Sequence, residues 1–526
     1  MKKTTILSIA AFALLFGSSC KKYLAINTNP NNATTATPEA ILPQAIVSTA
    51  SNMSGFNNYG AELVGYAANA GGYGGFGSNW TYNFAPTDYS TLWSNTFNTL
   101  QDFQAVMTYS AADTTHGLFN AVARIMKVYN YQLLVDTYNN IPYSQALQGA
   151  NDATPKYDDA KTVYPALAVQ LDSAIAIING AASSQAALTS ATDPMFGGNM
   201  TSWIQFANTL KLRLILRASA VVSFANTSFD PAGFLAADAI VNPGYAKVSG
   251  QQNPTWNYWV QTYAGGNGQR AWMPATYSFA YYDGSKLTDT FRGMAIYYTF
   301  PKTPNNQLGN GASSVPSAPS TTNGWYSGST STLGNAVGVM KGYNMGQPLL
   351  LAAESYFLQA EGQMRSIITS SGTVDSLFYM GIKSSFKYTY ELPDDKTIGE
   401  DTYGNNLDYV HDDSAYLAEN NTSYLVNFSL AGTPAQQLEA IITQKYIALN
   451  MVNSQESWNE YRRTGYPTCS QFNNDPVNSF ASTLSQSSRP DKLPTRILYP
   501  ASEYSYNAAN VPTGISPYTS LIFWAK

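Results

Sequence analysis

The chain has 526 residues and a net charge of −5, and charged residues make up 12% of it, about half the usual share of ~25%. Such sparse charge excludes the extended basic surfaces with which proteins bind nucleic acids. The 38 tyrosines and 9 tryptophans indicate instead a neutral polar surface suited to stacking on and hydrogen-bonding uncharged ligands.

The first 19 residues are typical of a secretory signal. Lys2 and Lys3 precede an apolar run over residues 6–16, which is too short to span a bilayer. Small residues and then Cys20 follow, in an order similar to a bacterial lipobox, although Gly17 stands where Leu is common. We therefore predict a lipoprotein signal peptide over 1–19 and a lipid on Cys20, with ordinary cleavage beside an incidental cysteine as the alternative.

The next segment, residues 20–37, is rich in Asn, Thr and Pro and predicts a lipid-anchored tether. Acylation of Cys20 would leave Cys469 without a disulfide partner, since the chain holds only two cysteines. No later apolar run reaches about 18 residues, so we expect the lipid alone to hold the rest of the chain at a membrane.

Beyond residue 38, apolar residues recur with the 3.6-residue period of amphipathic helices. The segments with this pattern are 118–133, 164–178, 200–221, 347–366, 374–388 and 434–453. They come roughly in pairs, which predicts a mainly α fold of tetratricopeptide-like helical hairpins, although the strict repeat consensus is absent. We expect residues 38–526 to form one domain, with long irregular aromatic-rich loop insertions at about 60–95, 250–345 and 390–432.

Near the C-terminus, "EAIITQKYIALNMVNSQESWNEYRRTGYP" predicts helix up to Gly465, which suits a left-handed C-cap. Glu456 precedes Arg462 by six residues, so a tertiary ion pair is expected rather than a local one. Buried arginines need carboxylate partners, and we expect Arg462, Arg463, Arg496 and Glu361 to serve the scaffold, with a surface that faces a partner protein as the alternative.

These motifs resemble those of the SusD/RagB lipoproteins of Gram-negative gut and soil bacteria. The similarity is carried by "ITQKYIAL", "SWNEYRRTGYP", "LPTRILYPASEYSYN", "INTNPNNATTATPEAILPQAI", "RIMKVYNYQLLVDTYNNIPYSQAL" and "FANTLKLRLILR". It extends from the lipobox to the last 30 residues.

The resemblance implies an all-α, SusD-like fold and an outer-membrane lipoprotein that faces the exterior. It also implies a partner, a SusC-type TonB-dependent transporter, to which the protein hands captured nutrients, usually oligosaccharides and in some members peptides. It implies no catalysis and no cofactor. Acidic residues often follow the cysteine in such surface lipoproteins, whereas Lys21 and Lys22 follow it here.

We expect the ligand contacts in the loops, because aromatic faces take the C–H faces of sugars and amides or Arg take the hydroxyls. The candidates are Asn79, Trp80 and Tyr82 in one loop, Trp256, Trp259, Tyr263, Arg270 and Trp272 in a second, and Trp325 and Tyr326 in a third. Packing beneath the loops is the alternative for each of them. A captured peptide is a second ligand class, which the low charge disfavours.

A surface glycoside hydrolase is the alternative from another class, since it needs only two suitably spaced carboxylates. The adjacent acidic pairs are Asp158/Asp159, Asp394/Asp395 and Asp412/Asp413, for which loop solvation or helix capping is the plainer explanation. No serine-hydrolase or zinc motif surrounds the two histidines. The acidic stretch "HDDSAYLAEN" lacks EF-hand spacing, so a Ca²⁺ site there has little support.

Overall fold

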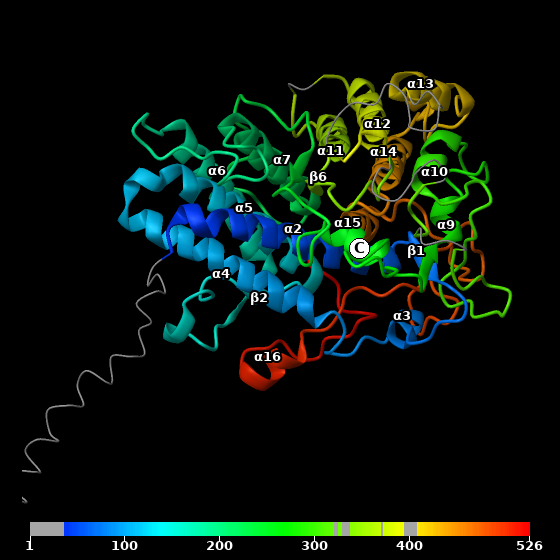
Figure 1. Ribbon diagram of the computed structural model, residues 1–526, viewed down its shortest axis with the longest axis horizontal. Helices are drawn as coiled ribbons and strands as arrows, with labels where there is room; N and C mark the ends of the chain where they lie inside the picture. The colour runs from blue at the N-terminus through cyan, green and yellow to red at the C-terminus, as the bar shows by residue number, and fades with distance from the viewer. Residues whose placement is uncertain (1–35, 320–323, 329–336, 370–371, 394–407) are drawn as a thin grey trace, which may run out of the picture.

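The computed structural model describes residues 36–319, 324–328, 337–369, 372–393 and 408–526. The predicted signal peptide, Cys20 and all but the last two residues of the predicted tether lie outside these ranges, as does the pair Asp394/Asp395. Within the described residues the protein is mainly helical, as predicted (Figure 1).

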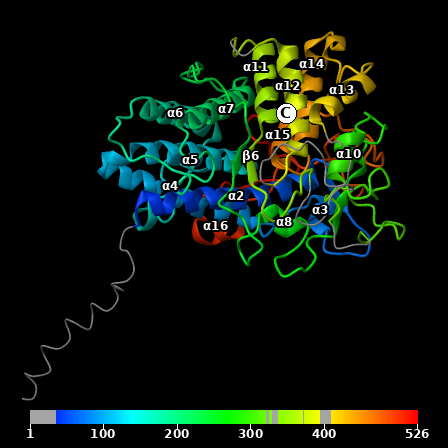
Figure 2. The ribbon, with the colours of Figure 1, turned by 45° about the horizontal axis from the view of Figure 1, so that its top comes forward.

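Long helices form two groups that follow one another along the chain. The first group is α2 (Pro38–Leu63), α4 (Ser90–Ala112), α5 (Gly117–Tyr138), α6 (Ala160–Asn179) and α7 (Met200–Ala218). The second is α11 (Ala352–Met364), α12 (Val374–Tyr390), α13 (Tyr409–Glu419), α14 (Pro434–Leu449) and α15 (Ser454–Thr464). Each helix packs against the next, from α2 through α7, and α7 packs on α11 to continue the array (Figures 1 and 2).

Shorter elements lie mostly in the connections. They are the helices α3 (Gly77–Thr81), α8 (Pro254–Trp259), α9 (Thr276–Phe279), α10 (Thr290–Ile296) and α16 (Ala501–Tyr506), and the 3₁₀ turns η2 (Thr114–His116), η3 (Gly149–Asn151) and η4 (Phe428–Leu430). The strands are β1 (Ala67–Asn69), β2 (Ile141–Pro142), β3 (Tyr157–Asp158), β4 (Ala239–Val241), β5 (Trp272–Pro274) and β6 (Gln347–Leu350). They pair antiparallel as β1–β5, β2–β3 and β4–β6.

Side-chain caps explain where several helices begin. Asp159, Asn199, Thr373 and Thr433 each accept a hydrogen bond from a backbone N–H in the first turn of the helix that follows, which satisfies one of the otherwise unpaired donors there. At the other end of the chain, Gly465 terminates α15 with φ +85°, the left-handed conformation predicted for it.

Two predicted helix bounds are wrong, and the ranges predicted as loops contain helices that we did not predict, among them α8, α9 and α10 within 250–345. The segment 347–366 begins with the strand β6, so helix α11 starts only at Ala352. The segment 434–453 breaks after Leu449, because Met451 takes φ +60° and Asn453 caps the next helix, α15. Helix α13 lies inside the 390–432 range that we predicted as a loop.

The helix α6 is long and apolar enough, by length and composition alone, to cross a membrane. In this fold it packs between α5 and α7. Its apolar residues, which include Leu167, Leu171 and Ile175, belong to one large hydrophobic core that the two groups share.

The first long helix, α2, and the last helix of the second group, α15, cross in close contact. A Cβ on Gly60 would lie 2.2 Å from the backbone nitrogen of Gln455, so the glycine permits the close approach of the two helices. The Asn57 side chain accepts a hydrogen bond of 2.9 Å from the Ser454 backbone N–H at the same crossing.

Candidate ligand-binding site

Most of the aromatic loop residues that we predicted as ligand contacts are buried. Exposed fractions range from 0% for Tyr82 to 7% for Trp272, and the seven buried candidates are Tyr82, Trp256, Trp259, Arg270, Trp272, Trp325 and Tyr326. A side chain with so little exposed surface has no face to offer a ligand. The structure therefore corrects our assignment of these seven to the binding surface.

Hydrogen bonds inside the fold explain this burial. The indole Nε1 of Trp259 donates to Asn58 Oδ1 of α2 at 2.8 Å. Trp325 donates to the carbonyl oxygen of Arg270 at 2.9 Å, and the Tyr326 hydroxyl donates to the carbonyl oxygen of Tyr66 at 2.9 Å. Buried Trp and Tyr need partners for their polar atoms, and here these partners come from the scaffold.

Arg270 also forms hydrogen bonds inside the fold, in this case to backbone carbonyl groups. Its guanidinium donates to the carbonyl oxygens of Trp259 at 3.1 Å and Val260 at 3.0 Å, which lie at the end of α8. Burial lowers the pKa of Arg270. Trp272 lies in β5, where its ring meets the Phe76 ring edge-on at a centroid distance of 5.1 Å. These side chains fix the loops onto the helices.

Asn79, Trp80 and Tyr263 are the three candidates that keep exposed surface. Asn79 donates hydrogen bonds to Glu62 and to the Tyr89 hydroxyl, and burial raises the pKa of the Glu62 carboxyl to about 8. Because its amide already serves this buried cluster, Asn79 is a support residue. Tyr263 is 48% exposed.

Trp80 is partly exposed on α3. Its ring stacks on the Phe76 ring, with centroids 5.4 Å apart, and its Nε1 donates to Asn69 Oδ1 at 3.1 Å. The tip of the indole lies against Gly311, where an added Cβ would be 3.6 Å from its Cη2. Gly311 belongs to the wall of an open cleft, so the structure brings Trp80 to the edge of this cleft.

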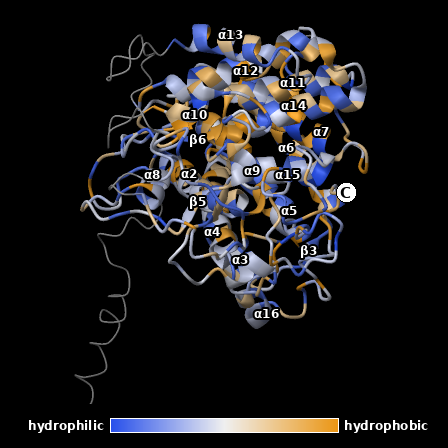
Figure 3. Ribbon diagram, turned by 90° about the vertical axis from the view of Figure 1, so that its right-hand side faces the viewer, coloured by the Kyte–Doolittle hydropathy of each residue, from blue (hydrophilic) through white to orange (hydrophobic). Residues whose placement is uncertain are grey.

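This cleft has a volume of about 560 Å³ and lies beside α9, at the loop-rich end that faces the viewer in Figure 3. It is formed by the segments 305–311 and 474–483. Its lining residues are Thr276, Asn305, Asn306, Gln307, Gly309, Asn310, Gly311, Asn474, Pro476 and Thr483. None of these ten carries a charge, and four asparagines and one glutamine supply most of its polar groups. We call this site the amide cleft.

The floor of the amide cleft is held by hydrogen bonds between its two segments. Gln307 Nε2 donates to the carbonyl oxygens of Asn473 at 2.6 Å and Ala481 at 3.0 Å. The Thr483 backbone N–H donates to the carbonyl oxygen of Leu308 at 2.9 Å. Both segments are thereby fixed before any ligand arrives, which reduces the entropy lost on binding.

Gly309 lets the two segments approach this closely. It has φ +86°, and a Cβ there would lie 2.4 Å from Ser482 Oγ and 2.7 Å from Thr483 Oγ1. Only glycine avoids both the left-handed strain and this overlap.

Two polar side chains at the cleft remain available to a ligand. Within the described part of the chain, the Asn474 amide and the Thr483 hydroxyl make no hydrogen bond of their own. Phe472, two residues before Asn474, is 73% exposed. The cleft thus offers amide donors and acceptors with the Trp80 ring at its edge, a combination that binds a neutral polyhydroxylated ligand.

The sequence analysis did not predict the amide cleft because it looked for aromatic residues, whereas amide side chains line this cleft. The signal was the pair of amide-rich runs "PNNQLGNG" (304–311) and "QFNNDP" (471–476), which we treated as ordinary loop. Their sequence separation gives no indication that they form opposite walls of one site.

Of the acidic residues considered for catalysis, Asp158, Asp159 and Asp412 hydrogen-bond within the fold, whereas Asp413 Oδ1 is buried without a hydrogen-bond partner among the described residues. Asp159 caps α6, and Asp158 accepts from the Ser144 hydroxyl at 2.6 Å. Asp412 lies on α13 and accepts from the Tyr390 hydroxyl at 2.8 Å. The described residues contain no group of three or more His, Cys, Asp or Glu side chains placed to hold a metal ion.

Residues 30–500 match the model of the SusD-like family described as starch-binding and associating with the outer membrane. A SusD homologue from Bacteroides uniformis is similar in structure, with 22% identity, a TM-score of 0.66, and 92% of this chain and 99% of that chain covered. A chitin-binding SusD homologue from Flavobacterium johnsoniae has 22% identity and a TM-score of 0.65, with 92% and 98% covered. A SusD/RagB family protein from Bacteroides thetaiotaomicron has 18% identity and a TM-score of 0.66, with 93% and 99% covered. No curated protein matches this chain.

Proposed function

Because this chain belongs to the SusD-like family of starch-binding proteins that associate with the outer membrane, we propose that its amide cleft binds a neutral oligosaccharide. Proteins of this family bind nutrients and are not catalysts. The family assignment and the helical fold confirm what the sequence motifs indicated. The cleft itself is the new element of the proposal.

The observation that carries the proposal is the uncharged, amide-rich lining of a cleft whose walls are held in place by hydrogen bonds. Asn474 and Thr483 supply unused polar groups, while the Trp80 ring supplies aromatic surface at the edge beside Gly311. A carbohydrate presents both hydroxyls and apolar C–H faces, so it matches both kinds of group. A charged ligand would find no countercharge in the lining.

Membrane attachment and delivery complete the proposed function. We propose that Cys20 carries a lipid that holds the protein on the outside of the outer membrane. From there the protein passes its ligand to a SusC-type TonB-dependent transporter. The lipobox order of residues 17–20 supports the anchor, and the outer-membrane association of the family supports the location. Several acyl chains suffice for stable attachment, since each buried methylene contributes about 0.8 kcal/mol.

Binding measurements on the purified chain test the proposal. Chito-oligosaccharides are the first probes, because relatives of this fold are described as chitin-binding, and malto-oligosaccharides are the second, because of the family description. Isothermal titration calorimetry should give a weak affinity that falls at least about tenfold in the variants Asn474→Ala and Phe472→Ala. The control is Tyr506→Ala, which removes an aromatic ring that is 80% exposed on α16, away from the cleft.

Two results would contradict the proposal. Equal affinity of all three variants would place the glycan elsewhere on the protein. Release of shorter sugars during incubation, detected by chromatography, would show catalysis and favour a hydrolase.

A further inference from the structure

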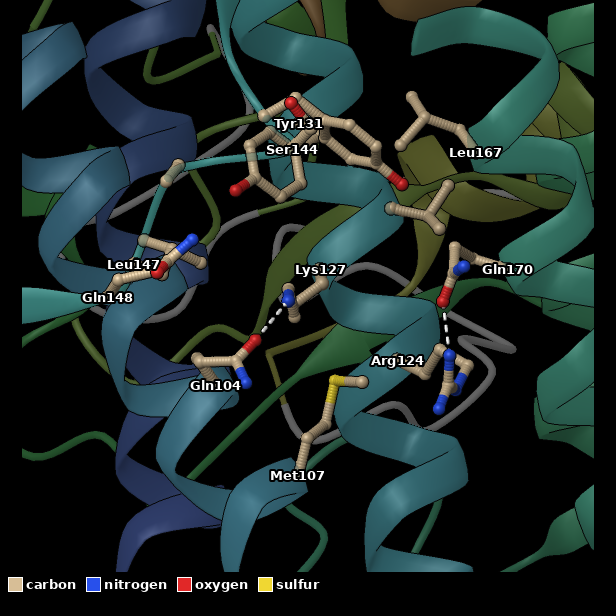
Figure 4. Close-up of a pocket in the computed structure, with 13 residues that line it drawn as sticks. Gln104, Met107, Arg124, Lys127, Tyr131, Ser144, Leu147, Gln148, Leu167 and Gln170 are labelled. Carbon is tan, nitrogen blue, oxygen red and sulfur yellow. Dashed lines mark hydrogen bonds between the residues drawn. The ribbon is translucent and has the colours of Figure 1, made fainter. Parts of the chain in front are cut away.

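A second pocket lies at the other end of the molecule from the amide cleft, among the helices of the first group (Figure 1). It has a volume of about 370 Å³ and is enclosed by α4, α5, α6 and the segment 143–148. Figure 4 shows two hydrogen-bonded pairs in its lining, Lys127 with Gln104 and Arg124 with Gln170. The two cations come from the same helix, α5.

Arg124 and Lys127 have only neutral partners. Lys127 Nζ donates to Gln104 Oε1 at 2.6 Å, and Arg124 donates to Gln170 Oε1 and, at 3.4 Å, to Asn120 Oδ1. Among the residues that the structure describes, no carboxylate lies within ion-pair distance of either cation. The third nitrogen of the guanidinium, Nε, is buried and has no hydrogen-bond partner in the same part of the chain.

This arrangement is unfavourable in the empty pocket. Both side chains are partly buried, and charges withdrawn from water need opposite charges or strong hydrogen bonds. They are also three residues apart on one helix, where like charges repel. Burial, together with the charge of Arg124, lowers the pKa of Lys127 to about 8. A neighbouring negative group would have the opposite effect on that pKa.

Asp158 contacts the segment 143–148 of the pocket and is already engaged there. Asp158 accepts hydrogen bonds from the backbone N–H groups of Tyr143 and Ser144, each at 2.9 Å, and from the Ser144 hydroxyl. It therefore holds the segment 143–148 in place and does not neutralise the cations. Arg217 and Lys445, two other buried cations of the scaffold, differ in this respect, because each contacts carboxylates directly.

We propose that this pocket binds a small ligand that carries a carboxylate group, with Arg124 and Lys127 as its two cationic contacts. A guanidinium and an ammonium side by side on one helix face present several N–H donors to one carboxylate, and charge-assisted hydrogen bonds of this kind are strong. The ligand would supply the negative charge that the described chain does not.

The remaining lining indicates the size and character of the ligand. A volume of about 370 Å³ is at the lower end of the range for small-molecule sites, about 300–1,000 Å³. Gln104, Gln170 and Ser144 provide hydrogen bonds for hydroxyl or amide groups, and Tyr131 and Tyr143 form an aromatic wall with ring centroids 4.9 Å apart. A uronic acid sugar and an acidic amino-acid residue both have this chemistry.

Calorimetry on the full chain, purified from membranes in detergent, tests the site with defined probes. Glucuronate and galacturonate are the ligands, and glucose and galactose are their matched controls, since each pair differs only by the carboxylate. N-acetylglutamate represents an acidic amino-acid residue. We expect the acids to bind and the neutral sugars not to bind, with the relative affinity of uronate and glutamate identifying the source of the carboxylate.

Variants connect the binding to the two cations. Arg124→Gln and Lys127→Gln should each lower the affinity for the acid by about tenfold or more. The control variant Lys161→Gln removes an exposed positive charge on α6 and should leave this affinity unchanged. The first two variants should also unfold at the same or a higher temperature, because each removes a repulsion. A structural role for these cations predicts a lower unfolding temperature instead.

The proposal is independent of the amide cleft, since Asn474→Ala should leave acid binding unchanged. It is overturned if no acid binds, if glucose binds as well as glucuronate, or if Arg124→Gln binds the acid as tightly as the unmodified chain.

Discussion

Arg463 of α15 donates two hydrogen bonds of 2.6 Å to the carboxylate of Glu361 in α11, across 102 residues of sequence. Both side chains are buried, and the paired geometry matches the planar guanidinium to the planar carboxylate. The carboxylate raises the pKa of Arg463, which stays charged throughout. This contact joins the end of α15 to α11, the first helix of the second group.

The pair belongs to a larger buried network at the centre of the scaffold. Glu456 accepts from Arg217 at 2.5 Å and from Lys445 at 2.8 Å. The members are Asp136, Glu354, Glu361, Glu456 and Glu460 with Arg213, Arg217, Lys445 and Arg463. The expected tertiary ion pair of Glu456 therefore exists, but with Arg217 and Lys445 and not with Arg462.

Removal of Arg463 should destabilise the fold strongly. In Arg463→Met the buried carboxylate of Glu361 loses its bidentate partner, and breaking a buried pair in this way costs about 3–5 kcal/mol. Urea unfolding followed by circular dichroism measures the change. The control is Lys387→Ala, whose ion pair with Glu391 is half exposed and is worth at most about 1 kcal/mol. Equal losses in the two variants would contradict a structural role for the buried pair.

The helical scaffold was predictable because its signal is local. Leu118, Val122 and Ile125 recur with the helical period, and the structure places them on α5. The start of α11 was not predictable in this way. Residues 347–350 are buried on both sides and pair with β4, more than a hundred residues earlier in the chain, so their apolar run looks like the start of a helix.

A buried carboxyl beside the loops should make stability depend on pH. Burial raises the pKa of Glu62 to about 8 from its ordinary value of 4.5, against hydrogen bonds from Tyr89 and Asn79. Between these two values the unfolded chain releases this proton and the folded chain keeps it. A rise in pH from about 5 to 8 therefore lowers the free energy of unfolding, by about 1.4 kcal/mol for each pH unit.

Glu62→Gln removes this titration while keeping a side chain of the same shape. We expect the variant to be more stable than the unmodified protein at pH 8 and to differ much less at pH 5. Urea unfolding at the two pH values measures both differences. A stability difference that is independent of pH would show that the Glu62 carboxyl does not titrate in this range.

The amide cleft should depend on a glycine that no side chain can replace. Gly309→Ala adds both left-handed strain and overlap with Ser482 and Thr483, whereas Gly265→Ala adds only the strain. Gly265 has a similar φ of +85° but no atom within 4 Å of the added Cβ. Left-handed strain alone costs about 1–2 kcal/mol, so we expect the larger loss of stability in Gly309→Ala.

The affinity for a glycan is the second property to measure in these two glycine variants. Gly309→Ala should weaken binding because it displaces the segment 474–483, and Gly265→Ala should leave it unchanged. Unchanged affinity in Gly309→Ala would remove the cleft from the binding site.

The site was harder to predict than the fold, for a physical reason. A tryptophan between glycines has the same local sequence whether it stacks on a sugar or packs under its own loop. Trp259 is buried because Asn58, some two hundred residues earlier, offers an acceptor for its indole N–H. Sequence patterns carry no information on such a distant partner, whereas they do record which residues share a helix face.

If the buried aromatic residues pack the fold, their removal should lower its stability, whereas a binding role would lower only the affinity for a glycan. Trp259 is 2% exposed, so Trp259→Ala should lower the free energy of unfolding by about 3–5 kcal/mol through the cavity it leaves. Tyr263→Ala, four residues later, removes a ring that is 48% exposed and should change stability by no more than about 0.5 kcal/mol. Thermal and urea unfolding of the two variants give the comparison. If Trp259→Ala instead kept full stability and lost only glycan affinity, the indole would have to face the ligand, and the packing role that the structure assigns to it would be wrong.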